Sequence, residues 1–215
     1  MAVIKIITPS VTDNTITLAK MASGTDGNII SYDTSGNPVA VATGSSGQVL
    51  TSAGAGAIPS FQTAGGGTNT PAFEAFVSAR TNISDNTDTK VAFNTEVFDV
   101  GSQYDNSSNF RFTPTTSGKY FVYANIGMGS GDNSGFGQGS IIIKKNGSNY
   151  VKGRMDNSSN NPNSMYKHVS SVIAMNGSGD YVEIFINVNS TGTPYVEGNN
   201  NHVKASLFGA FKIIE

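Results

Sequence analysis

Several residue types are absent or scarce in this 215-residue chain. It has no cysteine, which excludes a thiol nucleophile, a disulfide framework and any cysteine-based zinc site. Charged residues make up 13% of the chain and the formal net charge is −2. That balance excludes a strongly basic nucleic-acid binder, because contacts to phosphates need an excess of Lys and Arg. No apolar run reaches the roughly 20 residues of a membrane span, and the first residues lack a long apolar region, so we expect neither membrane insertion nor a signal peptide.

Small and uncharged polar residues are abundant instead. The chain contains 25 glycines and 23 asparagines, and 37% of its residues are hydrophobic, among them 8 tyrosines and 12 phenylalanines. This composition indicates an ordered chain with little surface charge. It is typical of an extracellular or virion β-protein rather than of a cytosolic enzyme.

The first 70 residues differ in composition from the rest. They contain two aromatic residues, Tyr32 and Phe61, and Gly, Ser, Thr and Ala account for 38 of the 70. Such a segment cannot bury enough apolar area to form its own core, so it is either disordered or shares a core with other chains. Short apolar groups separated by turn residues favour short strands that need partners at their edges. Residues 12–22 also fit a short helix.

The remaining residues show the period-two alternation of half-buried strands. In residues 119–126, 180–189 and 203–213, every second residue is apolar. The pairs Asn146-Gly147 and Asn176-Gly177 are typical of hairpin turns. No long helical period is present, so we expect an all-β sandwich or jelly roll.

Five motifs in this region occur in the order of a known family. They are Phe110-Arg111-Phe112-Thr113-Pro114, Gly118-Lys119-Tyr120-Phe121-Val122-Tyr123, Lys144-Lys145-Asn146-Gly147, Gly179-Asp180-Tyr181-Val182 and Ser206-Leu207-Phe208-Gly209-Ala210-Phe211. Together they resemble the complement-type globular head, a jelly roll akin to tumour necrosis factor, over residues 72–215. The resemblance implies a jelly-roll head that forms trimers about a three-fold axis.

The first part of the chain resembles stalk modules of bacteriophage tail fibres. The segments that carry this resemblance are residues 23–30, 32–38, 44–52 and 59–61. It implies a homotrimeric virion protein, assembled in the host cytoplasm, whose extended and intertwined β-rich stalk precedes the head. We therefore divide the chain into a virion attachment segment (1–22), which contacts other virion proteins, a stalk (23–64), a Gly-rich linker (65–71) and a head (72–215).

Catalytic constellations are not visible in the sequence. A serine hydrolase needs a histidine between a nucleophile and a carboxylate. His168 and His202 have no nucleophile-elbow motif nearby, so we interpret both as structural or surface residues. A polysaccharide depolymerase needs two acids about 5–10 Å apart, and the spacing of the acids singles out no pair. We expect no enzyme activity and no cofactor.

Three acids of the expected head are the candidates for metal binding. Calcium is held by carboxylate and carbonyl oxygens, and the resembled family sometimes binds calcium at the trimer apex. Asp99, Asp105 and Asp132 are the candidate ligands. The sequence contains no acidic loop of EF-hand spacing, so no metal is expected.

Asn-rich loops are the candidate recognition sites. Asparagine amides both donate and accept hydrogen bonds without the desolvation cost of a charge, and a tyrosine offers a flat face to a sugar ring. The candidate receptor-binding residues are Asp132, Asn133, Asn157, Asn160, Asn161, Asn163, Tyr166, Tyr195, Asn199, Asn200, Asn201 and His202.

These features favour a non-enzymatic virion fibre protein that binds a host-surface glycan or protein through a trimeric head. Weak sites repeated on each head and each particle would act by avidity. Two alternatives stay open. One is a structural head fibre or capsid decoration protein without a receptor role, and the other is a polysaccharide depolymerase.

Overall fold

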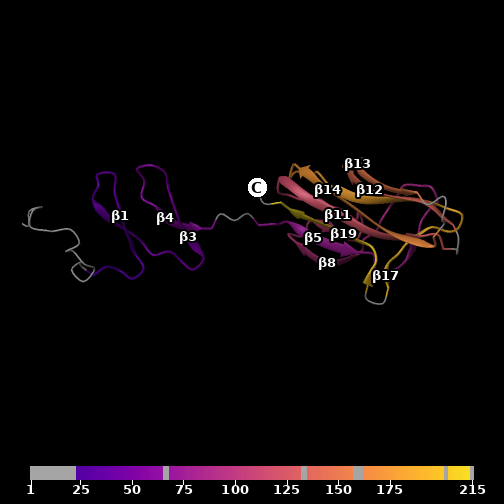
Figure 1. The fold of residues 1–215 in the computed structure, drawn as a ribbon, viewed down its shortest axis with the longest axis horizontal. Helices are drawn as coiled ribbons and strands as arrows, with labels where there is room; N and C mark the ends of the chain where they lie inside the picture. Colours follow the sequence, from indigo (N-terminus) through magenta and orange to yellow (C-terminus); the bar gives the residue numbers. More distant parts are fainter. Residues whose placement is uncertain (1–22, 65–67, 132–134, 157–161, 201–202, 214–215) are drawn as a thin grey trace, which may run out of the picture. The chain divides into compact units, whose positions relative to one another are not determined.

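The computed structural model describes residues 23–64, 68–131, 135–156, 162–200 and 203–213. It divides the chain into two compact units, Met1–Gly66 and Gly67–Glu215 (Figure 1). All regular secondary structure in the described residues is strand, which confirms the all-β class. Within them no helix is long and apolar enough to cross a membrane. The helix expected at 12–22 lies outside the described residues.

Among the described residues, the first unit contains four strands and the second contains fifteen. The strands are β1 (Ile29–Tyr32), β2 (Pro38–Val41), β3 (Gln48–Thr51), β4 (Ser60–Thr63), β5 (Ala72–Phe76), β6 (Thr81–Asn82), β7 (Thr89–Lys90), β8 (Thr95–Val100), β9 (Tyr104–Asp105), β10 (Arg111–Phe112), β11 (Gly118–Gly129), β12 (Phe136–Lys145), β13 (Ser148–Asp156), β14 (Ser164–Met175), β15 (Val182–Ser190), β16 (Tyr195–Val196), β17 (Asn199–Asn200), β18 (Val203–Lys204) and β19 (Leu207–Lys212).

The first unit consists of two successive antiparallel hairpins, β1–β2 and β3–β4. Each hairpin follows a turn closed by a backbone hydrogen bond, from the N–H of Asn28 to the carbonyl of Thr25 and from the N–H of Gln48 to the carbonyl of Ser45. The glycine of each turn, Gly27 or Gly47, has a φ near +80° (78° and 83°), which favours glycine. The two hairpins are therefore built on the same plan.

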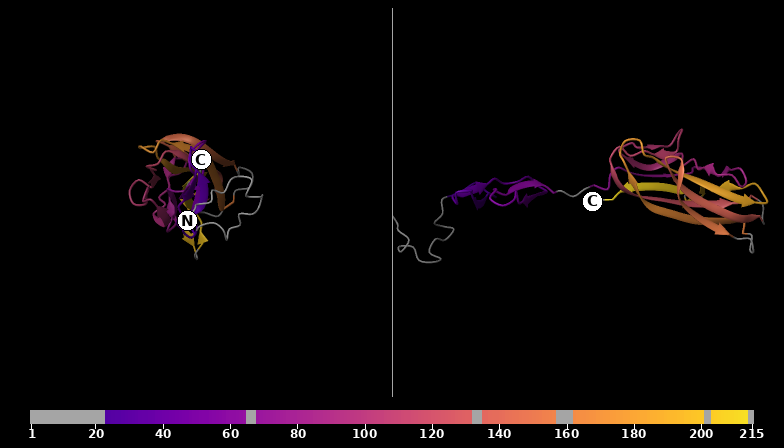
Figure 2. Two further views of the ribbon diagram at one scale, coloured as in Figure 1. Left: turned by 90° about the vertical axis from the view of Figure 1, so that its left-hand side faces the viewer. Right: turned by 90° about the horizontal axis from the view of Figure 1, so that it is seen from above.

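The second unit, the head, is a sandwich of two antiparallel sheets (Figure 2). The first sheet has the strand order β6-β16-β11-β19-β5-β8 and is called the β11 sheet. Both β16 and β19 pair with one edge of β11, and β14 pairs with its opposite edge. The second has the order β13-β12-β15-β10-β9, with β7 also on β15, and is called the β15 sheet. Over the long strands β11 to β15, the chain crosses between the sheets from β11 to β12, from β13 to β14 and from β14 to β15. These crossings are those of a jelly roll.

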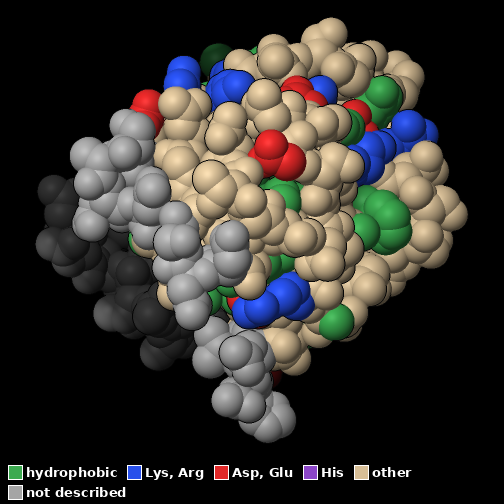
Figure 3. All heavy atoms as spheres, turned by 90° about the vertical axis from the view of Figure 1, so that its right-hand side faces the viewer, with side chains coloured by type: hydrophobic (Ala, Val, Ile, Leu, Met, Phe, Trp, Pro, Cys, Tyr) green, Lys and Arg blue, Asp and Glu red, His purple; other side chains and the backbone are tan. Residues whose placement is uncertain are grey.

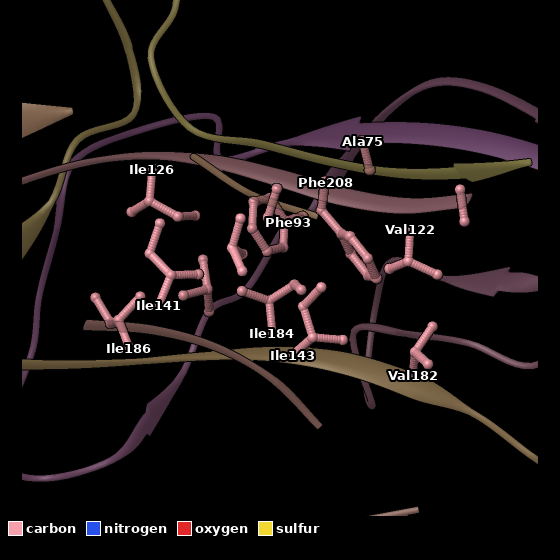
Figure 4. Packing of buried hydrophobic residues seen from close by; sticks show 14 of the residues in the cluster. Ala75, Phe93, Val122, Ile126, Ile141, Ile143, Val182, Ile184, Ile186 and Phe208 are labelled. Atoms are coloured by element: carbon pink, nitrogen blue, oxygen red, sulfur yellow. The ribbon is translucent and has the colours of Figure 1, made fainter. Parts of the chain in front are cut away.

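The core lies between the inner faces of the two sheets (Figure 4). Val122 and Ile126 of β11 face Ile141 of β12 and Ile184 and Ile186 of β15, and all five are fully buried. The alternation seen in the sequence places these residues on the inner faces. The expected buried faces of β11 and β15 are therefore confirmed.

Aromatic rings fill one part of this core. Phe73 of β5 stacks on Tyr104, with ring centroids 4.3 Å apart, and on Phe112, at 4.8 Å. Phe208 of β19 meets Phe73 edge to face, with ring centroids 4.8 Å apart, and packs against Phe93 in a tilted arrangement at 5.4 Å. The buried hydroxyl of Tyr104 donates to the carbonyl of Phe93 at 3.0 Å, so its polar group has a partner. Burial raises the pKa of Tyr104 well above its usual value.

The last predicted strand differs from the structure in two ways. The alternation over 203–213 predicts one continuous strand, whereas β18 ends at Lys204 and β19 begins at Leu207. Phe208 and Ala210 point into the core, and Leu207 and Phe211 point outward. Both faces of β19 are apolar, so periodicity alone did not decide which face is inside.

The expected hairpin turn at Asn146-Gly147 joins β12 to β13, with φ values of 51° and 77°. The amide of Asn146 donates to Asp180 at 2.8 Å and accepts from the N–H of Tyr181 at 2.9 Å. Lys145 Nζ lies 2.8 Å from the same carboxylate. One carboxylate thus ties the β12–β13 turn to the loop that leads into β15.

We expect Phe208→Ala to lower the free energy of unfolding by about 3–5 kcal/mol, because it removes a fully buried ring and leaves a cavity. Tyr150→Ala is the matched control, since Tyr150 is 49% exposed and its loss should cost less than about 1 kcal/mol. Urea denaturation followed by circular dichroism measures both. Equal losses in the two variants would contradict this packing.

Asp180 should make stability depend on pH. The Lys145 ammonium, followed by the Asn146 amide, lowers the pKa of Asp180 below its ordinary value of 3.8. Because the folded-state pKa is depressed, the stabilisation is present above 3.8 and is lost as the pH falls through the folded-state pKa. Urea midpoints at about pH 6 and about pH 3 should therefore differ less for Asp180→Asn than for the unchanged chain. The exposed Glu96 supplies the control variant, Glu96→Gln.

Candidate functional site

The candidate site lies at the end of the β11 sheet where β11 finishes, opposite the end where β5 begins and β19 ends (Figure 1). Residues Gly127, Met128 and Gly129 form the last part of β11. There β11 pairs with β14 on one side and with β16 on the other. Uncharged polar groups and backbone cover most of the described surface at this end of the molecule (Figure 3).

Arg80, in the segment that follows β5, occupies the centre of the site. Its guanidinium carbon lies 3.9 Å from the ring centroid of Tyr195, in the geometry of a cation–π contact. Its Nη2 and Nε donate to the two carboxylate oxygens of Glu197 at 2.7 and 3.4 Å. The hydrogen bond to Glu197 raises the pKa of Arg80. The Arg80 side chain is 52% exposed, so the remaining donors face solvent.

Two glycines of β11 make room for the aromatic rings. A Cβ on Gly127 would lie 2.8 Å from Cε1 of Tyr166 and 2.9 Å from Cβ of Glu197. A Cβ on Gly129 would lie 2.4 Å from the Tyr195 ring and 2.7 Å from the carbonyl oxygen of Asn163. The two tyrosines therefore lie directly on the backbone of β11, where only glycine leaves space for them.

The segment that carries Glu197 is tied to β11 by buried hydrogen bonds. The N–H of Glu197 donates to the carbonyl of Gly127 at 2.8 Å. The fully buried hydroxyl of Ser206 donates to the carbonyl of Glu197 at 2.6 Å and accepts from the N–H of Gly127 at 3.1 Å. These bonds hold the Arg80–Glu197 pair in place on a rigid element.

Tyr166 and Tyr195 play different parts in this site. Tyr195 is 7% exposed and the guanidinium covers its ring, so the ring positions Arg80 and does not face solvent. Tyr166, on β14, is 60% exposed and offers an open ring beside the charged pair. An exposed aromatic ring next to a guanidinium can contact a sugar ring or a protein side chain.

The other sequence-predicted receptor residues are placed as follows. Asn163 is exposed, and its carbonyl accepts from the N–H of Ser130 at 3.1 Å. Asn199 and Asn200 form β17, which pairs with β18. The candidates that lie outside the described residues are Asp132, Asn133, Asn157, Asn160, Asn161, Asn201 and His202.

Arg80 and Glu197 were missed by the sequence reasoning. They are 117 residues apart, and no local pattern links them. Gly127 and Gly129 were the one available signal, because paired glycines inside a strand pattern mark a close approach of other groups.

The two calcium candidates that the structure describes, Asp99 and Asp105, accept hydrogen bonds from backbone N–H groups of nearby turns. Asp105 accepts from the backbone N–H groups of Ser107, Ser108 and Asn109 at 3.0, 2.9 and 3.1 Å. These bonds hold the pKa of Asp105 far below its usual range. Asp99 accepts from the N–H of Tyr104 at 3.0 Å, and Asp132 lies outside the described part of the chain. Within that part, no three His, Asp or Glu residues gather as metal ligands.

Of the two histidines considered for catalysis, the structure describes His168, and His202 lies outside the described residues. His168 is exposed on β14 and pairs across the ladder with Asn125. Several acids instead form ion pairs: Asp88 with Lys144 at 3.4 Å, Glu183 with Lys90, and Glu197 with Arg80.

The outer face of the β11 sheet carries a second, apolar surface. Directly paired residues share a face, so Val172, Phe121, Phe211, Ala72 and Val100 form one row across five strands. Phe121 and Phe211 are in ring contact, with centroids 5.5 Å apart. Val172 is 46% and Val100 48% exposed.

The next row of this face is partly polar. It runs through Tyr123 and Glu74 to Phe98, which is 44% exposed. The hydroxyl of Tyr123 donates to Glu74 at 2.8 Å, which satisfies both groups within the face. The two rows together leave an apolar sheet face uncovered in the single chain.

Several solved structures are similar to this chain at low sequence identity. No protein-family model and no curated protein matches this chain. The chain is similar to the globular domain of zebrafish complement 1qA protein, with 17% identity and a TM-score of 0.48 over 66% of this chain and 97% of that one. It is also similar to murine APRIL, with 13% identity and a TM-score of 0.48 over 66% of this chain and 98% of that one. A third similar structure is the PRD1 vertex protein P5, with 17% identity and a TM-score of 0.47 over 80% of this chain and 85% of that one. The fold assignment itself rests on the sheet order and crossings described above.

Proposed function

We propose that this chain is a non-enzymatic virion fibre protein that forms a homotrimer and binds a host-cell surface glycan or protein through its head. The observation that carries the proposal is apolar surface left uncovered in both units of a single chain. In this proposal residues 1–22 attach to other virion proteins, residues 23–64 form the stalk and residues 72–215 form the head.

The hairpins of the first unit support self-association. A two-stranded hairpin is marginally stable in water unless further strands or another layer cover its apolar face. Ile30 is 57%, Tyr32 64%, Val49 48% and Leu50 46% exposed, although all four lie in or beside regular strands. Three copies wound together would bury these side chains and pair the free strand edges. This accounts for a stalk whose sequence is poor in apolar residues and yet patterned.

The apolar face of the β11 sheet supports the same assembly in the head. Its two exposed rows would be covered by a neighbouring copy, and the resemblance to trimeric complement-type heads makes three the expected number. The Arg80–Tyr166 site lies at the end of the sheet, away from the Phe121–Phe211 end of the face. Three such sites would therefore stay open on one assembled head and bind with avidity.

The first test is the solution mass of the full chain by light scattering. We expect three times the 22.4 kDa of one chain, because both units have apolar surface to cover. The double variant Phe121→Ser/Phe211→Ser should lower the mass or weaken the trimer, whereas Tyr150→Ser on the β15 sheet should leave it unchanged. A mass of one chain would refute the self-assembling fibre.

The second test concerns the receptor site. Fluorescently labelled full chain is applied to a panel of immobilised bacterial lipopolysaccharides, teichoic acids and capsular polysaccharides. Loss of one exposed aromatic contact should weaken binding to the recognised glycan about tenfold in Tyr166→Ala, while Tyr150→Ala, which is also exposed, keeps full binding.

Two outcomes of this second test favour the alternatives. A trimer that binds none of these immobilised glycans would favour the structural decoration protein. Release of reducing ends from a bound polysaccharide would favour the depolymerase.

A further inference from the structure

A polar pocket lies on the outer face of the β15 sheet, away from the Arg80–Tyr166 site and the apolar face. Its volume is about 190 Å³. Seven residues from β12, β13, β15 and the segment before β7 line it: Asn86, Gln138, Gly139, Ser140, Lys152, Arg154 and Asn187. Two of these side chains are cationic, four are uncharged hydrogen-bonding groups, and no carboxylate or aromatic ring lines the pocket.

Three of the lining side chains are held in position by hydrogen bonds to one another or to carboxylates beside the pocket. Arg154 Nη2 donates to Gln138 Oε1 at 2.8 Å, and Gln138 Nε2 donates to Asp156 at 3.0 Å. On the other wall, Asn187 Nδ2 donates to Asp88 at 3.1 Å, and Asp88 is paired with Lys144. The pocket is thus arranged before any ligand arrives, which lowers the cost of binding.

The backbone also fixes this surface. β12 is paired along its length with β13 on one side and β15 on the other. The N–H of Asn86 donates to the carbonyl of Val188 at 2.7 Å, which holds the Asn86 segment against β15. Because the ladders use the backbone N–H groups of the pocket floor, a ligand would be recognised by side chains rather than by a cradle of N–H groups of the kind that binds phosphate.

The charges select an anion. Lys152 forms no ion pair within the described residues, and its side chain is exposed. Arg154 is 61% exposed and lies 3.8 Å from Asp156. A guanidinium has five N–H donors, and one bond to Gln138 leaves others for a carboxylate. Two carboxylates neighbour the lining side chains: Asp88 is paired with the cation of Lys144, and Asp156 accepts a hydrogen bond from Gln138.

The uncharged groups select hydroxyls. Amides and a serine hydroxyl both donate and accept, as neighbouring hydroxyls of a sugar require. The pocket is smaller than the roughly 300–1,000 Å³ of a site for a drug-sized ligand, so it fits one small polar unit. We propose that this pocket binds a single carboxylated sugar unit of a larger saccharide, with Arg154 and Lys152 at the carboxylate and Asn187, Gln138 and Ser140 at the hydroxyls.

This site remains accessible in the assembly proposed above. The outer face of the β15 sheet is on the opposite side of the sandwich from the apolar face of the β11 sheet. Three copies that associate through the β11 sheet would present three such pockets to solvent, so weak single sites would again add up. The pocket is nevertheless a property of one chain and does not depend on a virion location.

The test uses the full chain and three probes that end in glucuronate, galacturonate or sialic acid, each beside its carboxyl-reduced counterpart. Inorganic phosphate is the fourth probe, and binding is measured by NMR titration. We expect millimolar binding of at least one acidic probe and at least about tenfold weaker binding of its reduced form, because bonds to a charged group are lost. Arg154→Gln and Lys152→Gln should each weaken binding about tenfold, whereas the exposed Lys204→Gln should not.

Four results would overturn the inference. They are no binding of any acidic probe, equal binding of an acidic probe and its reduced form, unchanged binding in both pocket variants, and phosphate binding as tight as that of the best saccharide. Circular dichroism and the urea midpoint show whether the variants are folded. Unchanged binding of Tyr166→Ala to the immobilised glycans would contradict the proposed receptor site and leave this result unaffected, since the two sites share no residue.

Discussion

The head depends on the packing of Phe73 and Phe208 between its two sheets. Phe73 is on the first strand of the head and Phe208 on the last, and their edge-to-face contact at 4.8 Å joins them near the centre of the β11 sheet. Phe73 also stacks on Tyr104 and Phe112, which belong to the β15 sheet. One ring therefore connects the start and end of the head with both layers. Such contacts between residues far apart in sequence close the sandwich.

Because β5 and β19 are neighbours in the middle of one sheet, the two ends of the head lie side by side. Around the described part of this sandwich, three areas differ in chemistry. The outer face of the β11 sheet is apolar, the outer face of the β15 sheet is charged and polar, and the end of β11 carries Arg80, Glu197 and Tyr166. The division of chemistry between the faces allows one face to bury itself against copies while the others stay in water.

The sequence was a good guide where one face of a strand is clearly apolar and the other polar. Val182, Ile184 and Ile186 are inside, as the alternation predicts, and Asn146-Gly147 turns between β12 and β13. It was a poor guide for 203–213, where Leu207 and Phe211 form a stripe as apolar as Phe208 and Ala210. Such a strand has no period-two signal that tells inside from outside, and the partner strands decide.

For the candidate sites, the difference between what the sequence predicts and what the tertiary structure decides is larger. The sequence by itself determined the all-β class, through period-two alternation and turn residues, and the contrast between a core-poor first part and a core-rich second part. It also predicted Tyr166 as a recognition candidate. The tertiary structure alone brought Arg80 to Glu197 across 117 residues, covered Tyr195 and assembled the Gln138–Arg154–Asn187 pocket from three strands. The reason is physical: periodicity reports which face of a strand is buried, whereas a site depends on which strands become neighbours.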